Sequence, residues 1–234
     1  MENAIIKQLK EWAQIYNNPQ FFQEDPIIFP TEFANRYRQG SCQIQDVEIS
    51  AIIASHLAWG RRAMIVRDCN RAFDQMDWKP YDYVMSGDYR NEDISLHRTI
   101  KWSEFARICD NLRKIYLEQS SIESFSDEEY RTMVFSQKPD KRAPNKKICM
   151  MRRWMVRDDG KVDLGIWKNI DPRDLRIPLD VHVYTQAQAL GLTKRKQKDI
   201  LTAEEITDAF REIFPNDPCL GDFSLFGYGV THQG

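Results

Sequence analysis

Lys146 and Asp180 have side chains that could carry out covalent chemistry, and they lie 34 positions apart in the sequence. A lysine amine is a nucleophile when it is neutral, and a carboxylate can stabilise a developing positive charge or accept a proton. Each residue also has a purely structural explanation. Asp180 stands where a helix is expected to begin, and aspartate is among the best N-cap residues. Lys146 lies on a basic helix, whose charged face is usually only a solvated surface.

The segment 176–192, RIPLDVHVYTQAQALGL, would position Asp180. Pro178 restricts its own φ and biases Ile177 towards extended geometry, so the chain should enter as an extended arm. Apolar residues then recur at helical spacing, and Gly191 follows as a typical residue after a helix C-terminus. The sequence therefore predicts a short helix from 181 to 190 with a carboxylate at its N-terminus.

Basic residues are concentrated in two segments, although the chain as a whole has a formal net charge of -2. The first segment, 138–157, contains Lys138, Lys141, Arg142, Lys146, Lys147, Arg152, Arg153 and Arg157 against one acid, Asp140. The second is KRKQK at 194–198. The net charge gives no reason to expect a nucleic-acid partner, but local segregation of charge does.

The composition is that of an ordinary globular protein, with 234 residues, 42% of them hydrophobic and 29% charged. This length suits one domain or two closely packed lobes. No apolar run approaches the ~18 residues of a membrane span, and the N-terminus lacks the apolar centre of a signal peptide. We therefore expect a cytoplasmic protein, nucleoid-associated if bacterial, without membrane contact. The cysteines are scattered without a C-x-x-C pair, so we expect reduced thiols and no metal, iron–sulfur cluster or other cofactor.

Helical periodicity dominates, so the predicted fold class is mainly α with little or no sheet. We expect helices at 5–16, 31–39, 46–59, 63–76, 103–116, 145–157, 181–190 and 202–213. Ser103 is a predicted N-cap, and capping boxes are predicted at 126–129 and 202–205. Only 161–167 and 176–179 have the character of extended strands.

The residues around Asp180 resemble a known catalytic segment. Leu-Asp-x-His-Val, followed by a helix ending Leu-Gly-Leu, is similar to the segment that holds the catalytic aspartate in base-excision DNA glycosylases of the helix-hairpin-helix superfamily. Asp180 would be that aspartate, and His182 its structural neighbour. Upstream, Lys-Lys-x-x-Met-x-x-Arg-Trp-Met-Val-Arg is similar to the archaeal 8-oxoguanine glycosylases and to a related uncharacterised bacterial family. The nucleophilic lysine of that pattern matches Lys146.

The segment between these two motifs also looks like the archaeal group, through Val162, Asp163, Gly165 and Trp167. There are two departures from the superfamily. The Gly-x-Gly-x-Lys hairpin sequence is absent, and Thr185 stands where many relatives have arginine. The resemblance therefore does not extend to DNA contacts through a standard hairpin.

The resemblance implies a mechanism for Lys146 and Asp180. Breaking an N-glycosidic bond builds positive charge on the deoxyribose, which a carboxylate stabilises while an amine captures C1′. The resulting Schiff base permits β-elimination, so base removal would be coupled to strand cleavage. Lys147 is the adjacent competitor for the role of nucleophile.

Such an enzyme must take its target base out of the duplex and hold it in a pocket. The resemblance suggests Trp59, Asp222 and Phe226 as pocket residues, the last two because Asp-Phe-x-Leu-Phe-x-x-Gly is similar to the C-terminal element of the family's pocket. Each has a structural alternative. Large aromatics dominate protein cores, and Asp222 could simply cap a final helix.

The sequence thus predicts a single domain over 1–234, made of two packed helical lobes with an active-site cleft between them. We expect a monomeric DNA glycosylase with AP-lyase activity that removes an oxidised base similar to 8-oxoguanine. The expected DNA-binding residues are Arg61, Arg62, Lys141, Arg142, Lys147, Arg153, Lys194 and Lys196. One alternative is a non-catalytic nucleic-acid-binding protein on the same fold. Another is a helical protein-interaction module, which would leave the segregated basic residues unexplained.

Overall fold

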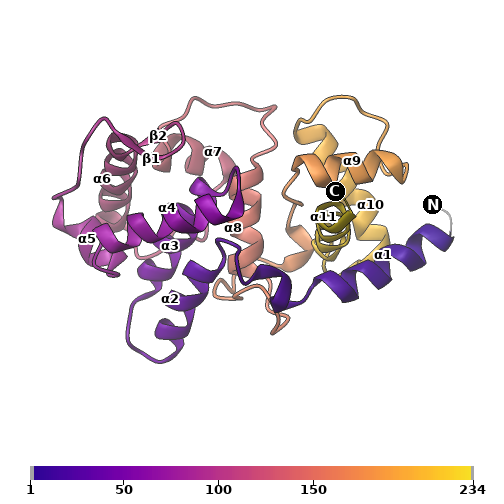
Figure 1. The fold of residues 1–234 in the computed structure, drawn as a ribbon, viewed down its shortest axis with the longest axis horizontal. Coiled ribbons are helices and arrows are strands. Elements are labelled where there is room, and N and C mark those ends of the chain that lie inside the picture. The colour runs from indigo at the N-terminus through magenta and orange to yellow at the C-terminus, as the bar shows by residue number, and fades with distance from the viewer. Residues whose placement is uncertain (1–2, 233–234) are drawn as a thin grey trace. The chain divides into compact units, whose positions relative to one another are not determined.

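The fold is mainly α-helical, as the sequence predicts (Figure 1). The structure, a computed structural model, describes the backbone of residues 3–232 and the side chains of residues 3–229. The chain divides into two compact units. The discontinuous unit consists of residues 1–23 and 140–234, and the central unit consists of residues 24–139. The expected active-site cleft between two lobes stays a prediction.

The discontinuous unit is built around the packing of its first and last helices. Its elements are α1 (Asn3–Tyr16), a 3₁₀ turn (Pro19–Phe22), α8 (Lys146–Val156), a 3₁₀ turn (Pro172–Asp174), α9 (Val181–Ala189), α10 (Ile200–Ile213) and α11 (Leu220–His232). Helices α1, α9 and α10 all pack on α11. Leu9, Val183, Phe210 and Leu225 are fully buried in the shared core. The Ser224 hydroxyl also donates a hydrogen bond to the Leu9 carbonyl oxygen at 2.7 Å.

The central unit surrounds one buried helix, α3. Its elements are α2 (Ile28–Arg38), α3 (Ile44–Leu57), α4 (Arg62–Gln75), α5 (Pro80–Ser86), β1 (Ser95–His97), β2 (Ile100–Lys101), α6 (Trp102–Glu118), α7 (Asp127–Glu129) and a π-helical turn (Tyr130–Val134). Every residue of α3 from Gln45 to Leu57 is buried, because α2, α4 and α5 pack against it. Such burial on all sides is expected of a helix as apolar as this segment.

The predicted helices are present, with starts that differ by a few residues, but the N-caps predicted for two of them are wrong. Helix α6 begins at Trp102 rather than after Ser103, and the Ser103 hydroxyl bonds to Asp93. Helix α10 begins two residues before Thr202, because Asp199 is its N-cap and accepts the Thr202 N–H at 3.1 Å. The predicted capping box at Ser126 and Glu129 is confirmed.

The extended segments are also corrected. Within residues 3–232, strands occur only in the short antiparallel hairpin of β1 and β2, where Ser95 pairs with Lys101 and His97 pairs with Ile100. Segment 161–167 is irregular and is instead tied to α8 through Leu164 N–H to Trp154 O at 2.7 Å. Segment 176–179 is extended but belongs to no sheet. Residues that favour an extended backbone do not form a sheet unless another strand lies beside them.

Candidate functional site

Asp180 is the N-cap of α9, as predicted from its sequence position. Its backbone is extended, and its Oδ1 accepts the Val183 N–H at 2.8 Å. Gly191 follows the helix with φ +71°, the left-handed conformation expected after a C-terminus. Asp180 is half-buried, and its second carboxylate oxygen forms no hydrogen bond among the described residues. Capping and catalysis are therefore compatible for this carboxylate.

Arg153 was expected on the DNA-binding surface, and this expectation is corrected. The side chain is only 4% exposed. Its guanidinium donates to Asp222 Oδ2 at 2.6 Å and lies 4.4 Å from the Phe223 ring centroid. A buried cation paired with a carboxylate inside the protein cannot reach a phosphate, so Arg153 stabilises the contact of α8 with α11.

Arg157, one helical turn further, is 1% exposed and anchors a second set of acids. It bonds to Asp217 at 2.7 Å and to Asp159 at 3.0 Å, and it also pairs with Asp163. Burial raises the pKa of the Asp163 carboxyl, while the positive charges of Arg153 and Arg157 oppose that rise. Much of the predicted basic face of α8 is therefore an internal ion-pair network.

Asp222 lies in the first turn of α11 and is 2% exposed. Burial raises the pKa of Asp222 to about 6, the guanidinium of Arg153 acts in the opposite direction, and the negative charge of Asp180 raises it further. The carboxylate of Asp222 is thus electrostatically coupled to Asp180. Its burial and its bond to Arg153 do not favour direct contact with a base.

Lys146 is the first residue of α8 and is half-buried. Among the described residues it forms no hydrogen bond or ion pair. Seven positions separate it from Arg153, which is about two turns or 10 Å along the same helix face. Lys146 therefore shares a helix face with Arg153, whose guanidinium binds Asp222. Lys147 is rotated by about 100° from it.

The two basic sequence segments meet in the folded chain. Arg142 Nη2 donates to Gln197 Oε1 at 3.1 Å, and the Ile200 N–H bonds to the Arg142 carbonyl oxygen at 3.0 Å. We call the exposed cations of this region the basic surface, which consists of Lys141, Arg142, Lys194, Lys196 and Lys198. Two acids lie close to it: Asp199 is 3.7 Å from the Arg142 guanidinium, and the Asp140 carboxylate accepts the Arg142 N–H at 2.9 Å.

The basic surface is attached directly to the helix that Asp180 caps. The Tyr184 hydroxyl and the Gln188 amide both donate to the Arg195 carbonyl oxygen at 3.0 Å. The Lys198 ammonium lies 5.3 Å from the Tyr184 ring centroid. The position of the 193–198 loop is therefore fixed relative to Asp180.

Phe226 lies on α11 opposite α9, and its ring meets the His182 ring edge-on at a centroid distance of 6.2 Å. It is half-buried at the margin of the core, so its role in a pocket stays a prediction. The remaining predicted residues, Trp59, Arg61 and Arg62, belong to the central unit. Trp59 follows α3, Arg61 is the N-cap of α4, and Arg62 is the first residue of α4.

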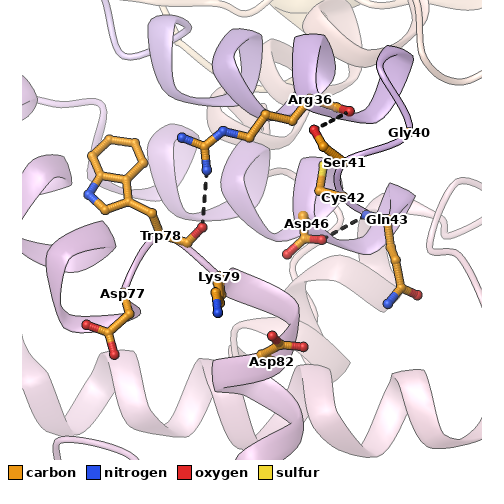
Figure 2. Close-up of a pocket in the computed structure, with 10 residues that line it drawn as sticks. All are labelled: Arg36, Gly40, Ser41, Cys42, Gln43, Asp46, Asp77, Trp78, Lys79 and Asp82. Atoms are coloured by element: carbon orange, nitrogen blue, oxygen red, sulfur yellow. Dashed lines mark hydrogen bonds between the residues drawn. The ribbon is translucent and has the colours of Figure 1, made fainter.

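The central unit contains an open pocket of about 490 Å³ (Figure 2). It is lined by Arg36, Gly40, Ser41, Cys42, Gln43, Asp46, Asp77, Trp78, Lys79 and Asp82. Asp46 accepts the N–H groups of Gln43 and Tyr81 at 2.9 Å, and Arg36 donates to the Trp78 carbonyl oxygen. No predicted site residue lines this pocket, and its buried carboxylate serves to cap two helices.

The described residues form neither a metal site nor a membrane-spanning helix. Among the described residues, no three His, Cys, Asp or Glu side chains are grouped so that they could hold a metal ion. No described helix combines the length and apolarity that crossing a bilayer requires. The cysteines are free, and burial, followed by the charge of Asp46, raises the pKa of Cys42 to about 11. That thiol is therefore protonated near neutral pH.

Sequence reasoning missed the residues that organise the interior around α8. Asp217, which pairs with Arg157, carried no signal of its own. Asp163 was singled out, but only as part of a motif. One signal was available in the sequence, because Arg153 and Arg157 are interspersed with large apolar residues. Arginines on a buried helix need acidic partners.

Comparison with known proteins identifies the family of the chain. No curated protein and no solved structure matches it significantly. One family matches over residues 25–135 and 126–231, which together cover most of the chain. This finding corrects the expected membership of the helix-hairpin-helix glycosylase superfamily. The chain belongs to the family described as "Protein of unknown function (DUF2400)".

Proposed function

We propose that the chain is a DNA glycosylase with AP-lyase activity, in which Lys146 is the nucleophile and Asp180 the assisting carboxylate. One observation carries this proposal. The Lys146 side chain has no partner among the described residues. It lies on the same face of α8 as Arg153, which binds Asp222. Burial raises the pKa of Asp222, and the negative charge of Asp180 raises it further. A lysine amine without an ion-pair partner is available as a nucleophile, and Lys146 lies on the helix face that also carries the Arg153–Asp222 pair.

In the proposed reaction, the neutral amine of Lys146 attacks C1′ of the target nucleotide. The C1′–N bond breaks, and the base leaves with its bonding electron pair and takes up a proton. The Asp180 carboxylate stabilises the positive charge that develops on the sugar and accepts a proton from the amine. Ring opening then gives a Schiff base, and loss of a C2′ proton expels the 3′ phosphate by β-elimination.

The basic surface would hold the DNA backbone. Three of its five cations lie on the 193–198 loop, which is hydrogen-bonded to Tyr184 and Gln188 of α9, and Arg142 is joined to that loop through Gln197. Phosphates bound there would therefore lie against the helix that Asp180 caps. Such contacts release counterions and carry no base specificity. An oxidised purine similar to 8-oxoguanine is the first target base that we would test.

Borohydride trapping is the decisive test. With a cognate lesion or an abasic site, borohydride should reduce the Schiff base to a stable protein–DNA adduct. Lys146→Gln should abolish the adduct and retain most of the binding, because one charge is a small part of the phosphate term. Lys147→Gln is the matched control and should still be trapped. Trapping that survives both substitutions together would overturn the mechanism.

A non-catalytic nucleic-acid-binding protein is the second candidate. The observation in its favour is the union of the two basic segments through Arg142 and Gln197, which requires neither Lys146 nor Asp180. Salt-dependent DNA binding without trapping on any lesion or abasic substrate would favour this function over the enzyme.

A further inference from the structure

The open pocket of the central unit is lined by three charged side chains that have no partner. Figure 2 shows Lys79 between Asp77 and Asp82, which come from the turn between α4 and α5 and from the first turn of α5. All three residues are exposed, and their side chains form no hydrogen bond or ion pair among the described residues. Two carboxylates and one ammonium that line a pocket without pairing leave their charges available to a bound molecule.

One buried carboxylate joins the two walls of this pocket. Asp46 is 8% exposed, and its oxygens accept the N–H groups of Gln43 and Tyr81, each at 2.9 Å. Gln43 belongs to the loop between α2 and α3, whereas Tyr81 lies in the first turn of α5. The separation of the two walls is therefore fixed by a single side chain. Such a pocket is formed before any ligand arrives, as most small-molecule sites are.

The turn that carries Asp77 and Lys79 is held in an uncommon conformation. Asp77 and Trp78 have φ of +50° and +52°, a region that residues with side chains rarely adopt. The Trp78 indole N–H donates to Asp74 at 2.9 Å, and Arg36 donates to the Trp78 carbonyl oxygen at 3.3 Å. These bonds fix the backbone that presents Asp77 and Lys79 to the pocket.

The other charges of the lining are already compensated. Arg36 pairs with Glu32 at 2.8 Å, and Asp46 accepts two backbone N–H groups. Cys42 adds no charge near neutral pH, because burial, followed by the charge of Asp46, raises its pKa to about 11. Two negative charges and one positive charge therefore remain without compensation. A molecule with two cationic groups and one anionic group matches this set.

We propose that the pocket binds a basic amino acid of the lysine, ornithine or arginine type. The carboxylate of the ligand pairs with Lys79, and its α-ammonium and side-chain cation pair with Asp77 and Asp82. The volume of about 490 Å³ is within the range of small-molecule pockets and accommodates such a ligand. This inference goes beyond the proposed glycosylase and depends on neither DNA binding nor Lys146.

Isothermal titration calorimetry with three related probes tests the charge pattern. L-Lysine carries all three charges, cadaverine lacks the carboxylate, and L-norleucine lacks the side-chain amine. The wild-type protein should bind L-lysine about fivefold more tightly than either analogue, because each analogue loses one ion pair in an open site. Three equal affinities, tighter binding of cadaverine, or no binding of L-lysine at millimolar concentrations would each overturn the proposal.

Variants of the lining locate the ligand. Lys79→Gln should remove the preference for L-lysine over cadaverine, because the carboxylate loses its partner, and it should still bind cadaverine. Asp77→Asn should weaken the binding of both amines without disturbing the turn, since asparagine adopts positive φ more readily than most residues. Lys138→Gln is the matched control, because Lys138 is an exposed lysine of the same unit that does not line the pocket. A Lys79→Gln protein that keeps the wild-type preference would contradict the proposal.

Discussion

Arg153 and Asp222 form a hydrogen-bonded ion pair at 2.6 Å, with both side chains almost completely buried. The pair joins the last turn of α8 to the first turn of α11. Removing one member of a buried pair leaves the other charge without compensation. The effect of removing one member on the free energy of unfolding can be measured separately from any effect on catalysis.

The pH dependence of stability should report on Asp222. Burial, opposed by Arg153 and reinforced by Asp180, raises its pKa from 3.8 to about 6. The stabilisation that protonation contributes is thus complete below about pH 4 and is lost as the pH rises through 6. Asparagine does not titrate, so Asp222→Asn should not lose this stability as the pH rises. The free energy of unfolding of the variant minus that of the wild type should therefore increase by up to about 3 kcal/mol between pH 4 and 7.

Urea unfolding at several pH values measures this difference. Asp208→Asn is a control, because Asp208 is an exposed residue of the same unit. A difference between Asp222→Asn and wild type that stays constant from pH 4 to 7 would mean that Asp222 is not protonated in this range.

Asp180 should have separable capping and catalytic roles. Asp180→Asn keeps an oxygen that can accept the Val183 N–H, so its melting temperature should stay near that of wild type. Asp180→Ala loses the cap and should be destabilised by about 1 kcal/mol. Both variants should lose base removal. An active Asp180→Asn enzyme would leave Asp180 with a capping role alone.

The basic surface should determine the salt dependence of DNA binding. Replacing Lys141, Arg142, Lys194 and Lys196 by glutamine should weaken binding to all sequences and lower the salt slope by up to about four. The charge-matched control replaces Lys7, Lys10, Lys161 and Lys168, which are exposed elsewhere on the same unit. Equal effects of the two quadruple variants on Kd and slope would argue against a localised DNA-binding surface.

Gly165 should matter more for stability than Gly160. Both have positive φ, so alanine should cost about 1 kcal/mol at either position. An added Cβ at Gly165 would also lie 2.5 Å from Asp158 Cβ, whereas nothing lies within 4 Å at Gly160. We expect Gly165→Ala to lower the melting temperature clearly more than Gly160→Ala. Equal shifts would show that the 162–167 segment can move away from Asp158.

Local signals in the sequence predicted much of the helical structure. The periodic apolar residues of α1 and the N-cap and glycine that bound α9 act within a few residues, so their effects can be read without knowing the fold. The β1–β2 hairpin was missed because strands of three and two residues leave almost no alternation to detect.

The environment of α8 could not be predicted in this way. Arg153 and Arg157 were interpreted as surface cations because their partners, Asp222 and Asp217, are 69 and 60 residues away in the chain. Likewise, the joining of the basic segments depends on Arg142 reaching Gln197, 55 positions later. Such contacts follow from tertiary packing rather than from local pattern.

The discontinuous unit has a consequence for the order of folding during synthesis. Ser224 of α11 bonds to Leu9 of α1 across 215 positions, and the central unit lies between them. At about 5–20 residues per second, α1 must wait roughly 10–40 s on the ribosome before its partner helix has been made. The central unit is complete much earlier and has its own buried helix α3. Translation therefore favours an order of events in which the central unit folds first. Until α11 has been made, α1 depends on chaperones or on transient contacts.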